Sequence, residues 1–392
     1  MELTMRFVLD ILGLFVAVIG AASITRDKPG SFRPLHILIN ELPWVPSLFG
    51  TLLAVLGLRR RRKPWAGILL GGVGALLASN TFLRWRAATD DMESAFKAGF
   101  GKDYLERIPP VARERLPSKR VSLGNSLGGS ARRDQGKLIR DIEFARPDGH
   151  SLYLDVYKPS VPPAIGDQYP AVIVIHGGGW RNGDKYEYFE SHSRHLAAQG
   201  YVVFDIQYRL APTTRWPGQL EDVKAAIRWV KKHADDYQLD PESILLLGRS
   251  AGAHLALMVV CCPDEDTRIR GVVSVYGPTE LRWEGLAPDS PIIELMGGPY
   301  ESLKAAYETA SPVAQAREGL PPILMIEGGM DALVPNTHGD LFSGRLYMLG
   351  SPFALLRIPW SRHGFDAVYF GMGAQVAQYY IDRFLAWSAY AA

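Results

Sequence analysis

Six short apolar segments between residues 171 and 359 constrain the fold most strongly, because amphipathic helical patterns such as residues 220–234 separate most of them. Short apolar strands that alternate with helices are typical of a mainly parallel sheet with helices on both faces. Upstream, residues 137–157 alternate around a Pro-Asp-Gly turn and predict a hairpin. We therefore predict an α/β fold. The six segments are residues 171–175, 201–208, 243–248, 271–277, 321–328 and 353–359.

A serine stands at the carboxyl end of one predicted strand, where ligands bind in such sheets. The stretch Gly-Arg-Ser-Ala-Gly, residues 248–252, lies between a buried strand and an apolar helix. At a junction from strand to helix, this spacing makes a tight turn that exposes the serine hydroxyl. The following helix points its positive end toward developing negative charge. We predict that Ser250 is a nucleophile.

A serine hydroxyl needs a base to accept its proton, and that base needs a third group to orient it. Asp331 follows one late strand and His363 follows the next. The chain order serine, aspartate, histidine is the order expected for this type of fold. Glu327 and Asp366 are the other carboxylates that could take the place of Asp331. The sequence predicts a catalytic triad of Ser250, Asp331 and His363.

Three successive glycines, residues 177–179, follow the first parallel strand. Glycines let the main chain approach a reacting group closely, and fixed backbone N–H donors stabilise the oxyanion of an acyl-transfer transition state. We expect Gly178, Gly179 and the N–H of Ala251 to form this oxyanion hole.

The substrate pocket is expected around the same loop. His176, Gly177 and Trp180 are the candidates for substrate contact, with the indole of Trp180 as a wall of the pocket. Residues 279–320 form an insertion between two strands and are predicted to cover the site as a small cap. The apolar residues of this insertion suggest a pocket for an apolar acyl or alcohol group. They include Trp283, Leu286, Ile292, Ile293, Leu295 and Met296.

Residues 137–392 resemble the hormone-sensitive-lipase-like esterases of the α/β-hydrolase fold. The motifs that carry the resemblance are HGGGW, DIQYRLAP, GRSAGAH, GGMDALVP and RHGFD, in that order. That family commonly has GDSAGG around the serine, whereas this chain has Arg249 and AGAH. The variant is more similar to the prenylcysteine methylesterase, feruloyl-esterase-like and arylformamidase branches. The resemblance implies an esterase but no particular substrate.

The first 86 residues contain three apolar segments that we expect to be transmembrane helices. They are residues 7–24, 37–58 and 65–83, and Pro43 and Pro46 interrupt the second. The third has small residues at four-residue spacing, Gly67, Gly71 and Ala75, which predict close helix packing. A polar, partly helical connector, residues 87–136, is expected to separate this membrane region from a hydrolase domain, residues 137–392.

Basic residues set the expected orientation in the membrane. Arg59 to Lys63 form a short basic loop between the second and third segments, which is typical of a cytoplasmic loop. This places the catalytic domain outside the cytoplasm. Several basic residues also flank the outer ends of the segments, so the charge asymmetry is modest. They are Arg26, Lys28, Arg33, Arg84 and Arg86.

The remaining composition limits partners and cofactors. A formal net charge of +2 gives no argument for a nucleic-acid partner, and the adjacent Cys261 and Cys262 suit core packing better than a disulfide. The predicted chemistry needs no cofactor and no metal. We expect a small-molecule or lipid-like ester substrate and a membrane partner, and homo-oligomerisation is left open. An amidase or peptidase with the same triad, or a binding protein on a hydrolase fold, are the alternatives.

Overall fold

The computed structural model describes residues 2–28, 34–59, 63–122, 124, 136–187, 189–282 and 286–391. Trp283 of the predicted cap, and residues 60–62 of the predicted basic loop, lie outside these residues. The chain divides into two compact units that are discontinuous in sequence. One comprises Met1–Glu93, Gly328–Pro335 and Arg357–Val376. The other comprises Ser94–Glu327, Asn336–Leu356 and Ala377–Ala392.

An eight-stranded sheet has the order β1-β2-β4-β3-β5-β6-β7-β8. The predicted hairpin is confirmed, since β1 and β2 pair antiparallel, and β2 also pairs antiparallel with β4. The pairs from β4 through β7 are parallel, as the alternating pattern predicts. The strands are β1 (Leu138–Ala145), β2 (Leu152–Tyr157), β3 (Tyr169–Ile175), β4 (Val202–Ile206), β5 (Leu239–Arg249), β6 (Gly271–Val275), β7 (Ile323–Gly328) and β8 (Phe353–Ile358).

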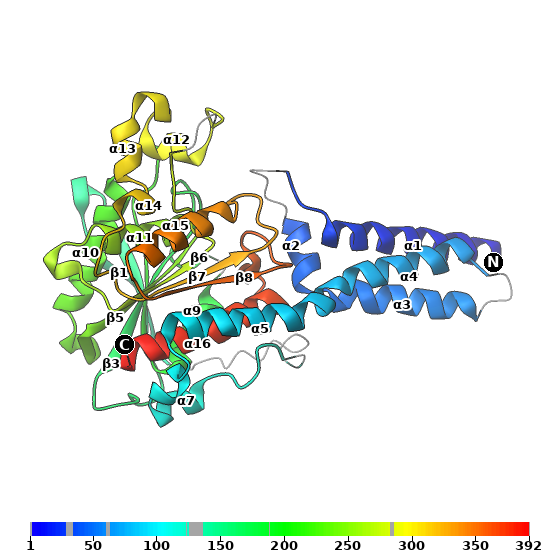
Figure 1. Cartoon of the computed structure of the whole chain (residues 1–392), viewed down its shortest axis with the longest axis horizontal. Helices are drawn as coiled ribbons and strands as arrows, with labels where there is room; N and C mark the ends of the chain where they lie inside the picture. Colours follow the sequence, from blue (N-terminus) through cyan, green and yellow to red (C-terminus); the bar gives the residue numbers. More distant parts are fainter. Residues whose placement is uncertain are drawn as a thin grey trace. The chain divides into compact units, whose positions relative to one another are not determined.

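Helices cover the sheet, so that β3 and β4 are buried along almost their whole length (Figure 1). Strands buried on both faces read as continuous apolar runs, which explains segments such as Ala171–Ile175. The larger helices are α9 (Glu190–Gln199), α10 (Gly218–Lys232), α11 (Ala251–Cys261), α15 (Thr337–Met348) and α16 (Met372–Tyr390). Shorter ones are α6 (Tyr104–Arg107) and α7 (Pro110–Arg115) before the sheet, and α12 (Pro291–Met296), α13 (Lys304–Thr309) and α14 (Pro312–Gln315) between β6 and β7.

The N-terminal helices are α1 (Glu2–Ile24), α2 (Pro34–Glu41), α3 (Trp44–Leu58), α4 (Trp65–Ala78) and α5 (Asn80–Phe100). Helices α1, α3 and α4 pack side by side (Figure 1). A Cβ added at Gly13 would lie 2.5 Å from the carbonyl oxygen of Gly67, and one at Gly50 would lie 2.5 Å from that of Gly71. The small residues of the third segment therefore permit close packing, as the sequence predicts.

The second apolar segment, predicted as a candidate helix over residues 37–58 that Pro43 and Pro46 interrupt, forms two helices. Helix α2 ends at Glu41, α3 begins at Trp44, and their directions differ by 73°. Pro43 explains the break, because proline has no N–H to donate and disfavours helical geometry in the preceding residue. Among the described residues, two helices are long and apolar enough to cross a membrane: Thr4–Ile24, within α1, and Trp65–Phe100, which runs through α4 and α5. The bent pair of α2 and α3 would be a third span if it counts as one.

Candidate active site

Ser250 occupies the turn between β5 and α11 in a strained conformation. Its φ of +53° and ψ of −118° lie in a region that residues with a side chain rarely adopt. Two hydrogen bonds fix the turn: the Ser250 N–H donates to the Val275 carbonyl at 2.9 Å, and the His254 N–H donates to the Ser250 carbonyl at 3.0 Å. Strand β6 and helix α11 therefore keep Ser250 in this strained backbone conformation.

The two glycines of the serine motif are required by close backbone crossings. A Cβ at Gly252 would lie 2.2 Å from the carbonyl oxygen of Ile175, at the end of β3. A Cβ at Gly248 would lie 2.3 Å from the carbonyl oxygen of Gly252. Only glycine fits such contacts without displacing the backbone. The turn therefore lies directly against the end of the neighbouring strand.

The glycine run approaches the same serine. A Cβ at Gly177 would lie 3.3 Å from the Cβ of Ser250. Gly178 and Gly179 have φ values of +108° and +61°, and the N–H of Asn182 donates to the Gly178 carbonyl at 3.0 Å. Ala251 begins α11, where the first N–H groups have no acceptor within the helix. The structure thus brings the glycine loop and the start of α11 to Ser250.

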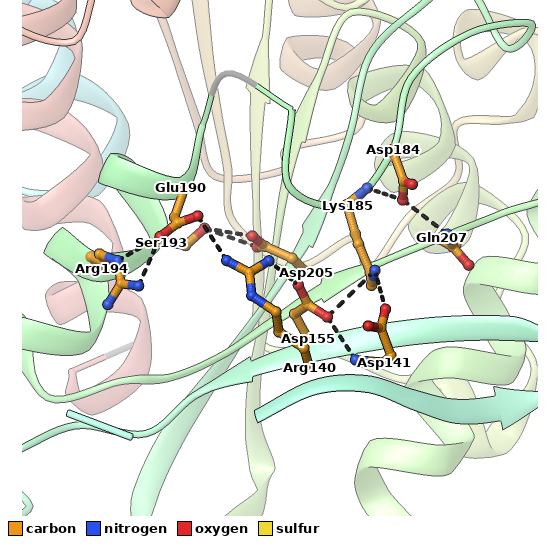
Figure 2. A network of polar contacts seen from close by, with 10 residues as sticks. All are labelled: Arg140, Asp141, Asp155, Asp184, Lys185, Glu190, Ser193, Arg194, Asp205 and Gln207. Atoms are coloured by element: carbon orange, nitrogen blue, oxygen red, sulfur yellow. Dashed lines mark hydrogen bonds and ion pairs between the residues drawn. The ribbon is translucent and has the colours of Figure 1, made fainter. Parts of the chain in front are cut away.

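A network of polar residues ties the chain after the glycine run to the sheet (Figure 2). One carboxylate oxygen of Asp184 accepts hydrogen bonds from Gln207 Nε2 at 2.9 Å and from the Lys185 N–H at 2.6 Å. The Lys185 ammonium lies 2.7 Å from Asp141 Oδ1 and 3.5 Å from Asp155 Oδ1, and its side chain is only 3% exposed. These contacts anchor the loop on β1 and β2.

Arg249, the departure from the family motif, is buried beside Ser250. Its guanidinium lies 4.1 Å from the centre of the Phe189 ring. It also acts electrostatically on Asp205, which accepts a hydrogen bond from Ser193 Oγ at 2.9 Å (Figure 2). Burial raises the pKa of Asp205 to about 8, and the Ser193 hydrogen bond and the charge of Arg249 act in the opposite direction. Arg249 therefore has a favourable charge interaction with Asp205.

His176 and Trp180 flank the glycine run and are both buried. The His176 ring stacks on Tyr208 with the ring centres 4.2 Å apart, and burial lowers the pKa of His176 to about 4. Trp180, 3% exposed, donates its indole N–H to His254 Nδ1 at 3.2 Å, and His254 Nε2 donates to the Ala310 carbonyl at 2.7 Å. Substrate contact by His176, Gly177 and Trp180 stays a prediction.

The predicted acid and base meet directly. Asp331 Oδ2 lies 2.7 Å from His363 Nδ1. The other carboxylate oxygen of Asp331 accepts the N–H groups of Leu333 at 2.9 Å and Val334 at 2.8 Å. Glu327, the other carboxylate near this strand end, accepts a hydrogen bond from Asn336 Nδ2 at 3.3 Å. Asp331 is therefore held in place by its own turn while it binds the imidazole.

The loops that carry Asp331 and His363 are joined by main-chain hydrogen bonds. The Gly329 N–H donates to the Ile358 carbonyl at 2.8 Å, and the Met330 N–H donates to the Ser361 carbonyl at 3.0 Å. Two main-chain hydrogen bonds therefore join the loops of Asp331 and His363.

Sequence reasoning missed three polar residues of the N-terminal region that contact the loop of His363. They are Asp27, Asn40 and Glu41. Asn40 and Glu41 interrupt an otherwise apolar stretch, and polar residues in such a stretch are a recognised signal of function. Among the described residues, no group of three or more His, Cys, Asp or Glu could hold a metal ion.

Comparisons with known proteins agree with this geometry. The BD-FAE family matches residues 154–346. The chain is 28% identical to the "Probable carboxylic ester hydrolase LipM" of Mycobacterium tuberculosis, over 94% of this chain and 91% of the relative. It is also 28% identical to "Esterase LipQ" of the same organism, over 72% of this chain and 71% of the relative. The solved structure of Thermogutta terrifontis esterase 2 with propionate bound has a TM-score of 0.51 and 27% identity, over 66% of this chain and 93% of that one.

The sheet order, the strained serine turn and these matches define an α/β-hydrolase. Within that class, residues 154–346 match the BD-FAE family, and the curated relatives that the chain resembles are carboxylic ester hydrolases and esterases.

Proposed function

We propose that the protein is a membrane-anchored serine carboxylic-ester hydrolase. Ser250 Oγ attacks the ester carbonyl while His363 accepts the serine proton, and the carboxylate of Asp331 orients and stabilises the resulting imidazolium. His363 then gives the proton to the leaving alkoxide, which leaves an acyl-enzyme. Water hydrolyses this intermediate through the same base and releases the acid. The proposal rests above all on the 2.7 Å contact between Asp331 and His363, together with the strained turn at Ser250.

The oxyanion of each tetrahedral intermediate is proposed to bind at Gly178, Gly179 and the N–H of Ala251. The positive φ values of both glycines and the position of Ala251 at the first turn of α11 support this assignment. Backbone donors in a fixed loop need no reorganisation when the charge develops. Each such donor contributes about 10² to 10³ to the rate.

The proposed substrates are short to medium acyl esters or lipid-like esters. Ile292, Leu295 and Met296 of α12 are buried apolar residues of the predicted cap, and they suit an apolar substrate group. The similar esterase from Thermogutta terrifontis is described with propionate bound and with butyrate bound. Both are carboxylates with short carbon chains, which favours the short end of this range for the present chain.

The proposed location is a membrane that the chain crosses several times, with the catalytic domain outside the cytoplasm. Large apolar side chains on the N-terminal helices are exposed, as expected for a surface that faces lipid. They include Leu14, Phe15, Val18, Leu48, Leu52, Leu69 and Leu76.

Cysteine accessibility tests this orientation. In a background in which Cys261 and Cys262 are replaced by alanine, Arg26→Cys and Ser126→Cys should react with an impermeant thiol reagent on intact cells. Arg61→Cys should not react until the membrane is permeabilised. The opposite pattern would place the catalytic domain in the cytoplasm.

Covalent labelling tests the chemistry. The full chain, purified in detergent, should be labelled by a fluorophosphonate probe and should hydrolyse a panel of p-nitrophenyl esters. Ser250→Ala should abolish labelling, and His363→Ala should slow it strongly. Labelling of Ser250→Ala at the wild-type level would overturn the assignment of the nucleophile. Faster turnover of matched amides than of esters would favour an amidase instead.

A further inference from the structure

The residues just before His363 are held by the N-terminal helical region. Trp360, Ser361 and Arg362 each make a polar contact with a residue between positions 22 and 41. All of these residues belong to the same compact unit as Asp331 and His363. The contacts therefore bear directly on the loop that carries the proposed base.

Asn40 contacts the first of these residues. Its side-chain Nδ2 donates to the Trp360 carbonyl at 2.5 Å and to the Ser23 carbonyl, near the end of α1, at 3.3 Å. Asn40 is 0% exposed. A buried amide that donates to two carbonyls fixes the main chain at Trp360, because losing either bond would leave a buried acceptor unsatisfied.

Glu41 joins both ends of the loop. Its Oε1 accepts from Ser361 Oγ at 2.6 Å, two residues before His363. Its Oε2 accepts from the Gly373 N–H at 2.6 Å and from the Ala374 N–H at 3.3 Å, at the start of α16. Hydrogen bonds to a carboxylate are stronger than those between neutral groups. One side chain therefore fixes the distance between the two ends of the segment that contains the histidine.

Arg362, the immediate neighbour of His363, binds the end of α1. Its Nη1 lies 2.7 Å from Asp27 Oδ2, and its Nη2 donates to the carbonyls of Thr25 at 2.5 Å and Ala22 at 3.2 Å. A cation at the C-terminus of a helix is stabilised by the last carbonyl groups. The arginine is therefore fixed both by a charge partner and by the helix end.

We propose that Asp27, Asn40 and Glu41 are positioning residues of the esterase reaction, through which the N-terminal helices set the geometry of His363. This inference rests on the proposed function, since it assigns His363 as the base. A displacement of about 1 Å in a catalytic group can cost 10²-fold in rate. The N-terminal region is then a working part of the active site as well as an anchor.

The test uses the full chain in detergent, with Glu41→Gln and Asn40→Leu as the main variants. Glutamine keeps the size of Glu41 but replaces one of its two carboxylate oxygens with an NH2 group. It therefore cannot accept from both Ser361 and Gly373. We expect kcat for p-nitrophenyl butyrate to fall by about 10- to 100-fold with KM within about twofold of wild type. The matched control is Asp10→Asn, because the Asp10 carboxylate accepts the Gly67 N–H at 2.6 Å and so joins two N-terminal helices. The control should retain kcat within about twofold.

Fluorophosphonate labelling separates positioning from folding. The labelled fraction at long times counts folded active sites, whereas the labelling rate reports proton transfer from Ser250. The proposal expects complete labelling at a rate reduced by the same factor as kcat. Reduced labelling of Glu41→Gln, with a normal rate for the sites that do react, would show a purely structural role and overturn it.

A coupled pair keeps the test decisive if Glu41→Gln folds poorly. Ser361→Ala removes only the hydroxyl that donates to Glu41, and it should lower kcat by a smaller factor. Adding Ser361→Ala to Glu41→Gln should lower kcat little further, because both changes disrupt the same hydrogen bond, the one from Ser361 Oγ to Glu41. Wild-type kcat in Glu41→Gln, Asn40→Leu and Ser361→Ala, while Ser250→Ala is inactive, would overturn the positioning role alone. Full labelling of Ser250→Ala would instead overturn the proposed function.

Discussion

The turn that carries Ser250 and the loop that carries His363 both follow a strand of one sheet. The residues that hold them in place differ in how far they lie from the turn or the loop in the sequence. The serine turn is fixed by neighbours in the sheet, chiefly Val275 and the glycines that cross β3. The histidine loop is fixed by Asn40 and Glu41, which precede their partners by 320 positions or more.

The difference shows which structural constraints a short sequence motif can reveal. A strained turn must carry its own glycines, because the residues with no room for a Cβ, Gly248 and Gly252, lie two positions from the serine. The histidine loop needs no special residues of its own and contacts its supports through ordinary ones such as Ser361. The supporting residues, Asn40 and Glu41, lie far away in the sequence. Four substitutions or conditions would break or sharpen this contrast.

Replacing Ser250 with alanine should have the largest effect. We expect ester turnover to fall by about 10⁴ to 10⁶, because the members of a triad act as a unit. The melting temperature should stay close to that of the wild type, since alanine keeps the main-chain hydrogen bonds that fix the turn. Turnover assays and thermal melting of the full chain would measure both. A modest loss of activity would mean that another nucleophile operates.

Asp331→Asn should cost about 10⁴ in rate, because the amide cannot support the imidazolium and favours the wrong tautomer. The control is Glu327→Gln, a nearby carboxylate held by Asn336. That change should cost far less in kcat/KM. If Glu327→Gln were the crippling variant, the acid of the triad would have to be reassigned.

Lowering the pH should reduce the free energy of unfolding through His254, which lies in the helix that follows Ser250. Burial lowers the pKa of this histidine from 6.5 to about 4, partly offset by its hydrogen bond to Ala310. The unfolded chain binds more protons in this range, so the stabilisation is complete above pH 6.5 and is lost as the pH falls toward 4. The loss is on the order of 3 kcal/mol.

Urea unfolding at several pH values would measure this dependence. His254→Gln is the comparison, because glutamine can accept from Trp180 and donate to Ala310 without titrating. Its unfolding free energy should vary less with pH than that of the wild type. An unchanged slope would show that the dependence comes from other groups.

Gly252→Ala should destabilise the protein by about 1 to 3 kcal/mol and lower turnover, because a Cβ would meet the backbone of Ile175. Gly344→Ala in α15 is the matched control, since no atom lies within 4 Å of its added Cβ. Alanine there should stabilise the helix by about 0.5 to 1 kcal/mol. Equal melting temperatures for the two variants would contradict the close crossing.

Most of the hydrolase fold can be predicted from the sequence. The alternation of apolar strands and helices gives the parallel sheet, and the turn at residues 146–150 gives the hairpin, because both depend on local periodicity. The contact of Asp331 with His363 also follows from their places at the ends of adjacent strands. That contact arises because the ends of neighbouring strands meet at one edge of a sheet.

The contacts of the N-terminal helices with the histidine loop could not be predicted in this way. Residues 37–58 look like one apolar span, and only Pro43 marks the break that ends α2 at Glu41. No periodicity pairs Glu41 with Ser361, because the contact depends on tertiary structure. Residues 1–93 share a compact unit with the loops of Asp331 and His363. The boundaries of the membrane region, residues 1–86, stay a prediction.

The contacts of Glu41 have a consequence for the biosynthesis of the enzyme. During translation, Glu41 leaves the ribosome before any strand of the sheet, and its partner Ser361 follows 320 residues later. Closing so long a segment has an entropic cost, so these bonds form only after the intervening sheet has brought their ends together. The histidine loop is then among the last parts of the molecule to be completed. If Ser250 and His363 act as proposed, a nascent chain would complete the serine turn well before the histidine loop, and it would hydrolyse no ester until that loop had formed.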